Sequence, residues 1–101
     1  MDKIFKAMAD KNRRKILTVL KEKEMSVYEI LVNFTITQAT LSNHLSILKK
    51  ANLVKCSIRG KQRIYRLNQE ALEVFGHNIS NFVGIFHKNL TEEISIRSKI
   101  H

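Results

Sequence analysis

The 101-residue sequence predicts a mainly α fold with one small β-hairpin, arranged as a winged helix-turn-helix domain. Three observations lead to this prediction. The chain has no proline and only 3 glycines, so little interrupts its helices. Apolar residues recur at helical spacing in four short segments before residue 52 and in a long one after residue 67. Two strand-like runs around one glycine lie between them, so we expect the order α-α-α-α-β-β-α in a single domain, residues 1–101.

The four short helices are predicted from their apolar spacing and their capping residues. Asp10 is suited to cap the second helix, and Ser26 the third, with Glu29 at the capping-box position. Thr37 is suited to cap the fourth helix after a short break. The expected helices are residues 2–9, 11 to about 23, 27–34 and 38–51.

The hairpin and a long last helix follow. The runs VKCSI and QRIYRL are β-branched and aromatic, and Arg59-Gly60-Lys61 joins them, which favours a hairpin. From Asn68 a helical pattern continues to about residue 90 or beyond. Its apolar residues follow a 3-4-3-4 spacing, typical of a helix that pairs with another helix. We therefore expect a homodimer interface formed by Leu72, Phe75, Ile79, Phe82 and Phe86.

Several classes of protein are excluded by what the sequence lacks. No apolar run reaches the length of a membrane span, and the N-terminus does not resemble a signal peptide. The single cysteine, Cys56, cannot form an internal disulfide, so we expect a reducing cytoplasm. No nucleophile–base pair, phosphate-binding glycine loop or paired carboxylates are visible. We therefore expect neither an enzyme nor a cofactor.

The net charge of +9 is unevenly distributed. Residues 1–67 hold 15 basic and 5 acidic side chains, giving +10, and residues 68–101 hold 3 and 4, giving −1. No acid occurs between Glu29 and Glu70. We expect the basic part, residues 2–67, to bind a polyanion and the remainder, 68–101, to be a dimerisation helix and tail.

The fourth predicted helix has the two faces that DNA reading requires. Leu41, Leu45 and Leu48 form an inward stripe, and small or neutral polar residues occupy the other side. Gln and Asn can bond adenine bidentately, Ser and Thr can bond bases or phosphates, and an alanine methyl can contact a thymine methyl. The helix N-terminus suits a phosphate, and the hairpin tip adds cations for the DNA backbone or minor groove. The candidate DNA-binding residues are Thr37, Gln38, Ala39, Thr40, Ser42, Asn43, His44, Arg59, Lys61 and Arg63. For His44, at the flank of the stripe, packing and a phosphate contact are equally open.

These blocks resemble the ArsR/SmtB family of winged helix-turn-helix repressors. The resemblance covers residues 4–67 and is carried by KAMADKNRRKILTVL, MSVYEIL, TQATLSNHLSILKKANLV and RGKQRIYRL. It departs at Lys11 and Ala39, where many members carry a proline that the helix does not need. The resemblance implies a dimer that places two recognition helices in successive major grooves of an A·T-rich inverted repeat. The positions that match the family's DNA contacts are Gln38, Ala39, Ser42 and Asn43, beside the hairpin residues.

Metal sensing, which the family also includes, is not expected here. The cysteine-containing motif on the third helix is absent. On the last helix, Phe75 and Leu90 stand where that site has ligands, which leaves His77 and His87 as weak candidates. A zinc-responsive repressor that uses these two histidines across the dimer is the alternative. Cys56 is expected to be an apolar filler rather than a redox sensor.

The family also suggests how such a repressor is released. Members without a ligand site include autorepressors that a partner protein sequesters, and this short layout is similar to the autorepressor type of sporulation-delaying-protein immunity. A sequestering protein is therefore an expected partner, beside operator DNA and a second copy of the chain. An RNA-binding or purely protein-interacting winged helix is the remaining alternative.

Overall fold

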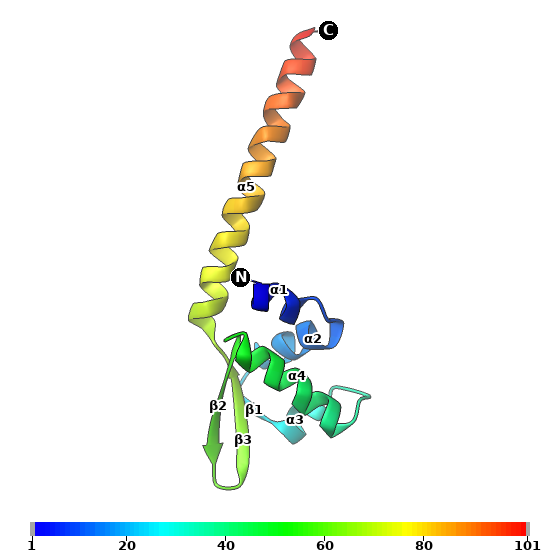
Figure 1. Cartoon of the computed structure of the whole chain (residues 1–101), viewed down its shortest axis with the longest axis vertical. Helices are drawn as coiled ribbons and strands as arrows, with labels where there is room; N and C mark the ends of the chain where they lie inside the picture. The colour runs from blue at the N-terminus through cyan, green and yellow to red at the C-terminus, as the bar shows by residue number, and fades with distance from the viewer. Residues whose placement is uncertain (1, 101) are drawn as a thin grey trace. The chain divides into compact units, whose positions relative to one another are not determined.

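The computed structural model describes the backbone of residues 2–100 and the side chains of residues 2–87. The chain divides into two units, Met1–Ala71 and Leu72–His101, and each is described by itself. The observed architecture is mainly helical with a small antiparallel sheet, as the sequence predicts (Figure 1). In chain order the elements are α1 (Asp2–Met8), α2 (Lys11–Leu20), β1 (Met25–Ser26), α3 (Val27–Leu31), α4 (Gln38–Lys50), β2 (Val54–Arg59), β3 (Gln62–Leu67) and α5 (Gln69–Ile100).

The sheet contains a strand that the sequence did not reveal. The strand order is β1-β3-β2, with both pairs antiparallel, so β3 lies in the centre. Met25 pairs with Tyr65 and Ser26 with Ile64. A strand of two residues has no measurable alternation, and only its tertiary pairing with β3 identifies it.

Two helices end about three residues earlier than expected, and α1 and α4 each end one residue earlier. α2 stops at Leu20 rather than near residue 23, because the chain must extend into β1 a few residues later. α3 stops at Leu31 rather than at residue 34. There the amide of Asn33 bonds the Ile30 carbonyl at 3.0 Å, which tightens the chain into a turn that leads to α4.

The predicted caps of α2, α3 and α4 are present. The Asp10 side chain accepts hydrogen bonds from the amides of Asn12 and Arg13. Ser26 and Glu29 form the complete capping box of α3, in which Ser26 N donates to Glu29 Oε1 at 3.1 Å. Thr37 Oγ1 accepts from Thr40 N at 3.1 Å at the start of α4. These local bonds fix the directions in which the three helices begin.

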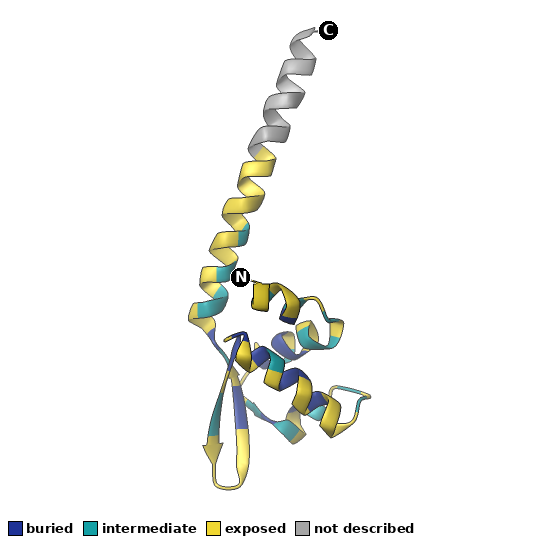
Figure 2. Cartoon of the chain, viewed as in Figure 1, coloured by how far each residue is buried: buried dark blue, intermediate teal, exposed yellow. Residues whose placement is uncertain are grey.

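The core of the first unit lies where α1–α4 and the sheet meet (Figure 2). The predicted leucine stripe of α4 is buried: Leu41, Leu45 and Leu48 are each 0% exposed. Burying one such side chain contributes about 1.5–3 kcal/mol, so this stripe orients α4 strongly. The other buried apolar residues are Ala7, Ile16, Leu17, Leu20, Ile30, Ala51, Leu53, Val54, Ile64 and Tyr65.

Two positive φ angles set the direction of the hairpin. Asn52 (φ 64°) follows α4, and the amide of Leu53 bonds the Leu48 carbonyl at 3.0 Å, the pattern of a Schellman motif. Gly60 (φ 62°) is the first residue of the two-residue turn between β2 and β3, where glycine avoids a steric penalty. Asn68 caps α5 rather than beginning it, because its Oδ1 accepts from Ala71 N at 3.3 Å.

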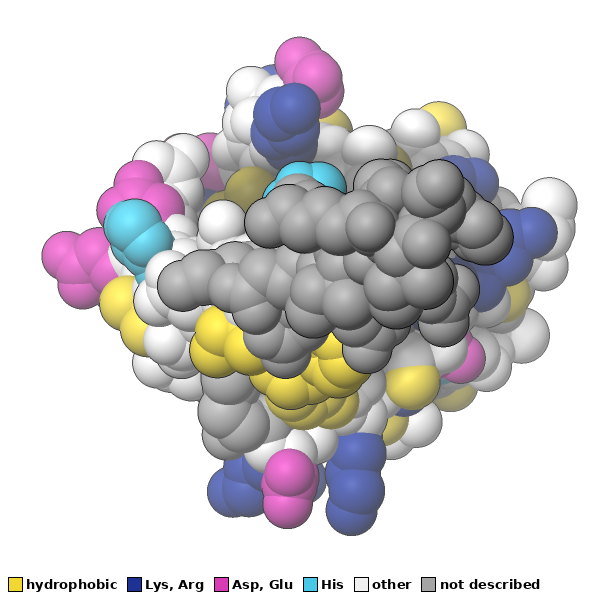
Figure 3. All heavy atoms as spheres, turned by 90° about the horizontal axis from the view of Figure 1, so that it is seen from above, with side chains coloured by type: hydrophobic (Ala, Val, Ile, Leu, Met, Phe, Trp, Pro, Cys, Tyr) yellow, Lys and Arg dark blue, Asp and Glu magenta, His cyan; other side chains and the backbone are white. Residues whose placement is uncertain are grey.

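The helix of the second unit presents apolar side chains to solvent. Phe82 and Phe86 are 59% and 62% exposed, and their rings pack edge to face with centroids 5.0 Å apart. Leu72, Phe75 and Ile79 are partly exposed. Figure 3 shows hydrophobic side chains exposed together on the face that it presents. The other large exposed apolar residues of α5 are Val74, Val83 and Ile85.

Candidate nucleic-acid interface

The side of α4 opposite the leucine stripe is exposed and polar. Gln38, Ala39, Thr40, Ser42 and Asn43 are all exposed, as is the capping residue Thr37. The Thr37 hydroxyl also donates to Thr40 Oγ1 at 2.9 Å, so these two side chains hold each other at the helix start. The first-turn amides before Thr40 have no partner within the helix, which suits them to a phosphate oxygen.

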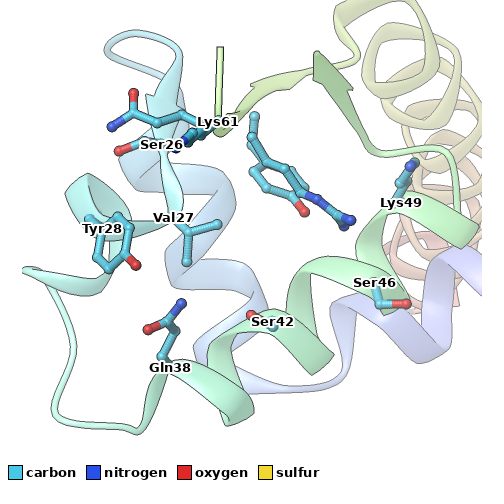
Figure 4. Close-up of a pocket in the computed structure, with 11 residues that line it drawn as sticks. Ser26, Val27, Tyr28, Gln38, Ser42, Ser46, Lys49 and Lys61 are labelled. Atoms are coloured by element: carbon cyan, nitrogen blue, oxygen red, sulfur yellow. The ribbon is translucent and has the colours of Figure 1, made fainter. Parts of the chain in front are cut away.

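An open groove of about 400 Å³ runs beside this face. In Figure 4, Gln38, Ser42, Ser46 and Lys49 succeed one another along α4, and Tyr28 lies across the groove from them. The structure thus brings Gln38 and Ser42 together with Lys61 and Arg63 of the hairpin. The groove is lined by Ser26, Val27, Tyr28, Gln38, Ser42, Ser46, Lys49, Lys61, Gln62, Arg63 and Tyr65.

Tyr28 is one of the groove residues that sequence reasoning missed. It lies within the capping box of α3, between the buried Ser26 and the exposed Glu29, and is itself 62% exposed. The sequence signal was its place in α3 outside the apolar positions Val27, Ile30 and Leu31. An exposed tyrosine beside a polar helix face supplies a flat apolar ring and a hydroxyl, both of which suit contact with a nucleotide.

The three predicted hairpin cations do not have the same surroundings. Arg59 forms a bidentate ion pair with Glu24, in the segment between α2 and β1, and this carboxylate raises the pKa of the Arg59 guanidinium. Among the residues that the structure describes, no carboxylate lies within ion-pair distance of Lys61 or Arg63. Lys61 and Arg63 therefore keep an uncompensated charge beside the groove, whereas the charge of Arg59 is balanced locally.

The structure answers the question that the sequence left open for His44. This residue is buried at 8% exposure, and its Nδ1 lies 3.2 Å from Arg13 Nη1. It belongs to the buried side of α4, next to the leucine stripe, and this position favours packing over a phosphate contact. The ring is held inside because Arg13 satisfies its polar nitrogen there.

Two candidate sensor residues, Cys56 and His77, lie on different elements, β2 and α5. Cys56 is half-buried on β2, where it pairs with Tyr65 across the sheet. Burial is the main cause that raises the pKa of the Tyr65 hydroxyl, followed by Cys56. His77 lies beside Glu73 in a shallow hollow on α5. Within the described part of the chain, no three His, Cys, Asp or Glu side chains gather into a metal-binding group. Leu90 lies outside the described side chains.

Among the residues that the structure describes, no helix combines the length and apolarity that crossing a bilayer requires.

The short helix α3, the turn after it and α4 with its exposed polar face form a helix-turn-helix, and the cationic hairpin of β2 and β3 flanks it. Together they define a DNA-binding winged helix-turn-helix module. The chain belongs to the arsR family of bacterial regulatory proteins, whose family model matches residues 10–55. It is a DNA-binding transcriptional regulator of a non-enzymatic family.

Two relatives illustrate the family. The chain is 36% identical over 83 residues to the transcriptional repressor SdpR of Bacillus subtilis (strain 168), covering 82% of this chain and 92% of that protein. It is 33% identical to an arsenical resistance operon repressor of Staphylococcus xylosus, covering 75% of this chain and 73% of that protein.

Solved structures show the same architecture. An ArsR-like transcriptional regulator from Rhodococcus sp. RHA1 superposes with a TM-score of 0.82 at 20% identity, covering 99% of this chain and 92% of that one. HlyU from Vibrio cholerae N16961 superposes with a TM-score of 0.63 at 30% identity, covering 76% and 87%. The expected winged helix-turn-helix fold class is thereby confirmed.

Proposed function

We propose that the chain is a homodimeric, sequence-specific repressor that binds an inverted-repeat operator in the cytoplasm. The observation that carries the proposal is the exposed face of α4, with Gln38, Ser42 and Asn43. Beside it lie two hairpin cations, Lys61 and Arg63, which have no carboxylate partner among the described residues. Gln38 and Asn43 would read adenine edges in the major groove. Lys61 and Arg63 would contact phosphates or the minor groove and fix the register of the helix.

The two parts of the chain would divide the work. Within one domain, residues 2–67 would bind DNA, and residues 68–101 would pair with the same segment of a second copy. The apolar seam of Leu72, Phe75, Ile79, Phe82 and Phe86 supports this division, because large apolar patches on a soluble regulator commonly mark an interface. Two α4 helices would then meet half-sites about one helical turn, roughly 34–36 Å, apart.

Selection from a random-sequence duplex library tests the proposal. The purified full-length chain should enrich duplexes that share an inverted repeat with half-site centres about 10 base pairs apart. A matched library of RNA hairpins, selected in parallel, should yield no enriched motif. Enrichment of a motif without two-fold symmetry, or of RNA alone, would contradict the proposed function.

A zinc-responsive repressor remains the second candidate, with His77 and His87 joined across a dimer. Glu73 beside His77 in the same hollow favours it, because a carboxylate and an imidazole one helical turn apart can share a cation. Titrating zinc into the complex with the selected duplex decides between the two. Unchanged affinity at stoichiometric zinc would rule out the zinc-responsive candidate, and His77→Ala should then have no effect.

A further inference from the structure

One polar residue occupies the buried side of α4. His44 follows Leu41 and precedes Leu45, both 0% exposed, and is itself 8% exposed. Its Nδ1 lies 3.2 Å from Nη1 of Arg13 on α2. Because arginine has only donors, Nδ1 must carry the lone pair in this bond, and the hydrogen of the neutral ring is on Nε2.

The same guanidinium is bonded to the end of α1. Arg13 Nε donates to the Ala7 carbonyl at 2.8 Å, and Nη2 donates to the Lys6 carbonyl at 3.0 Å. The Arg13 amide donates to Asp10 Oδ1 at 3.1 Å, at the N-cap of α2. A single side chain therefore joins the last turn of α1 and the start of α2 to the middle of α4, which pack against one another.

We propose that Arg13 is a positioning residue for DNA recognition, which holds α4 at the α1–α2 junction through the neutral imidazole of His44. The inference deepens the proposed function and rests on it. His44 directly follows Asn43, so a rotation or shift of α4 at His44 would move Asn43 and Ser42 relative to the base edges. The leucine stripe determines which face of α4 is buried but makes no directional bonds, whereas the three hydrogen bonds of the Arg13 guanidinium fix direction as well as distance.

The charge of His44 decides whether this bond exists. A protonated ring has no acceptor at Nδ1 and would face the Arg13 guanidinium as a second cation. The charged groups that the structure places against the ring are Arg13 on α2 and, across space, the carboxylate of Asp10. No hydrogen bond or ion pair reaches it from α1, α3 or β2 among the described residues.

Two substitutions of His44 separate the acceptor from the packing. His44→Asn places an amide oxygen, which can accept the same hydrogen bond, where Nδ1 was. His44→Leu fills the buried position with an apolar side chain that has no acceptor. The asparagine variant should bind the selected duplex like the wild type. The leucine variant should bind about tenfold more weakly, as expected when a hydrogen bond to a charged group is lost.

The ratio of affinities for the selected duplex and a scrambled duplex supplies a readout that a merely structural role would not move. His44→Leu should lower the affinity for the selected duplex more than the affinity for the scrambled one, because it releases the face of α4 that carries Asn43 and Ser42. His44→Asn, which restores the acceptor, should keep the wild-type ratio. A ratio that falls in His44→Asn would overturn the proposal, even if His44→Leu failed to fold.

Arg13 and Arg14 provide a matched pair of cations. Arg14 donates one bond, from Nη1 to the Met8 carbonyl at 2.8 Å, and does not contact α4 through a hydrogen bond. Arg13→Lys should weaken binding of the selected duplex about tenfold, and Arg14→Lys should leave it unchanged. Arg13→Lys combined with His44→Leu should weaken binding no further than either substitution alone. Additive losses, or equal effects of the two lysine substitutions, would refute the junction while leaving the proposed function intact.

Discussion

Arg59 at the end of β2 and Glu24 before β1 form a bidentate ion pair between the hairpin tip and a segment 35 residues away in sequence. The Nη2–Oε2 distance is 3.1 Å, and the Arg59 and Glu24 side chains are 59% and 39% exposed. At such exposure the pair adds little stability. Its consequence is electrostatic, because it balances one of the three cations that the hairpin was expected to offer to DNA.

Removing the Glu24 charge should therefore release Arg59 to phosphate. Glu24→Gln is expected to strengthen binding to random duplex DNA and to steepen the dependence of log affinity on log salt by about one unit. Fluorescence anisotropy across a salt series measures both quantities. Glu22→Gln removes the same charge two residues away, at an exposed position with no ion pair among the described residues, and is the control. Equal effects of the two variants would show that overall charge, not the pair, is responsible.

Substitutions of Asn43 and Lys61 should affect DNA binding in different ways. Asn43→Ala should relax the preference at one base pair, at a cost of about 1–3 kcal/mol for the selected sequence. Lys61→Ala should weaken binding to all sequences alike and lower the salt slope by about one unit. Competition between the selected duplex and single-base variants separates these outcomes. If both substitutions lower affinity equally on selected and random duplexes, α4 does not read the bases.

The capping box gives a prediction for stability. Ser26→Ala removes the acceptor for the Glu29 amide, and we expect it to destabilise the fold by about 1 kcal/mol. Urea unfolding followed by circular dichroism measures the change. Ser46→Ala, at an exposed position within α4, is the control and should be neutral or slightly stabilising. A neutral result for Ser26→Ala would mean that the β1–β3 pairing alone holds α3 in place.

Acid should weaken the fold through Asp10 and Glu29. The Arg13 amide holds the pKa of Asp10 below its ordinary range, and the Ser26 amide does so for Glu29. A carboxyl group whose pKa is lower in the folded state stabilises the fold when it is ionised. This stability is present above the unfolded-state pKa and is lost as the pH falls through the folded-state pKa. The urea concentration at the unfolding midpoint should therefore decrease when the pH is lowered below about 4, where carboxyls titrate. The difference in urea midpoint between the wild type and Asp10→Asn should vanish at that low pH. The midpoint of Glu22→Gln should follow that of the wild type at every pH.

Self-association should depend on the aromatic residues of α5. Phe82→Ser together with Phe86→Ser removes the exposed aromatic pair and should convert the dimer into monomers in sedimentation velocity. Ile58→Ser, at an apolar hairpin position that is 74% exposed, should leave the dimer intact. A wild-type chain that sediments as a monomer at micromolar concentration would contradict the proposed homodimer.

Local sequence patterns predicted the parts of this fold that depend on neighbours in the chain. The stripe of Leu41, Leu45 and Leu48 places α4 because helical periodicity is a local property. The capping box of Ser26 and Glu29, and the hairpin around Gly60, depend on residues three or fewer positions apart. The exposed polar face of α4 follows from the same periodicity, so most of the candidate DNA-binding face was predictable.

The remaining features depend on contacts between distant residues. Whether α2 ends at Leu20 or later depends on β1, which exists only because β3 is beside it. The groove between Tyr28 and the hairpin likewise requires the packed fold. Sequence alone could not assign His44 to packing or to DNA, since either role suits a polar residue at the edge of an apolar stripe.

By itself, then, the sequence determined the order of elements, the family and the polar face of α4, because these depend on local spacing and on residue type. Only the tertiary structure decided which charges and polar groups are satisfied. It paired Arg59 with Glu24 and left Lys61 and Arg63 without a carboxylate partner among the described residues. It also placed His44 against Arg13. The physical reason is that electrostatic pairing depends on distance in space, and residues 31 or 35 positions apart come within hydrogen-bond reach only when the chain folds.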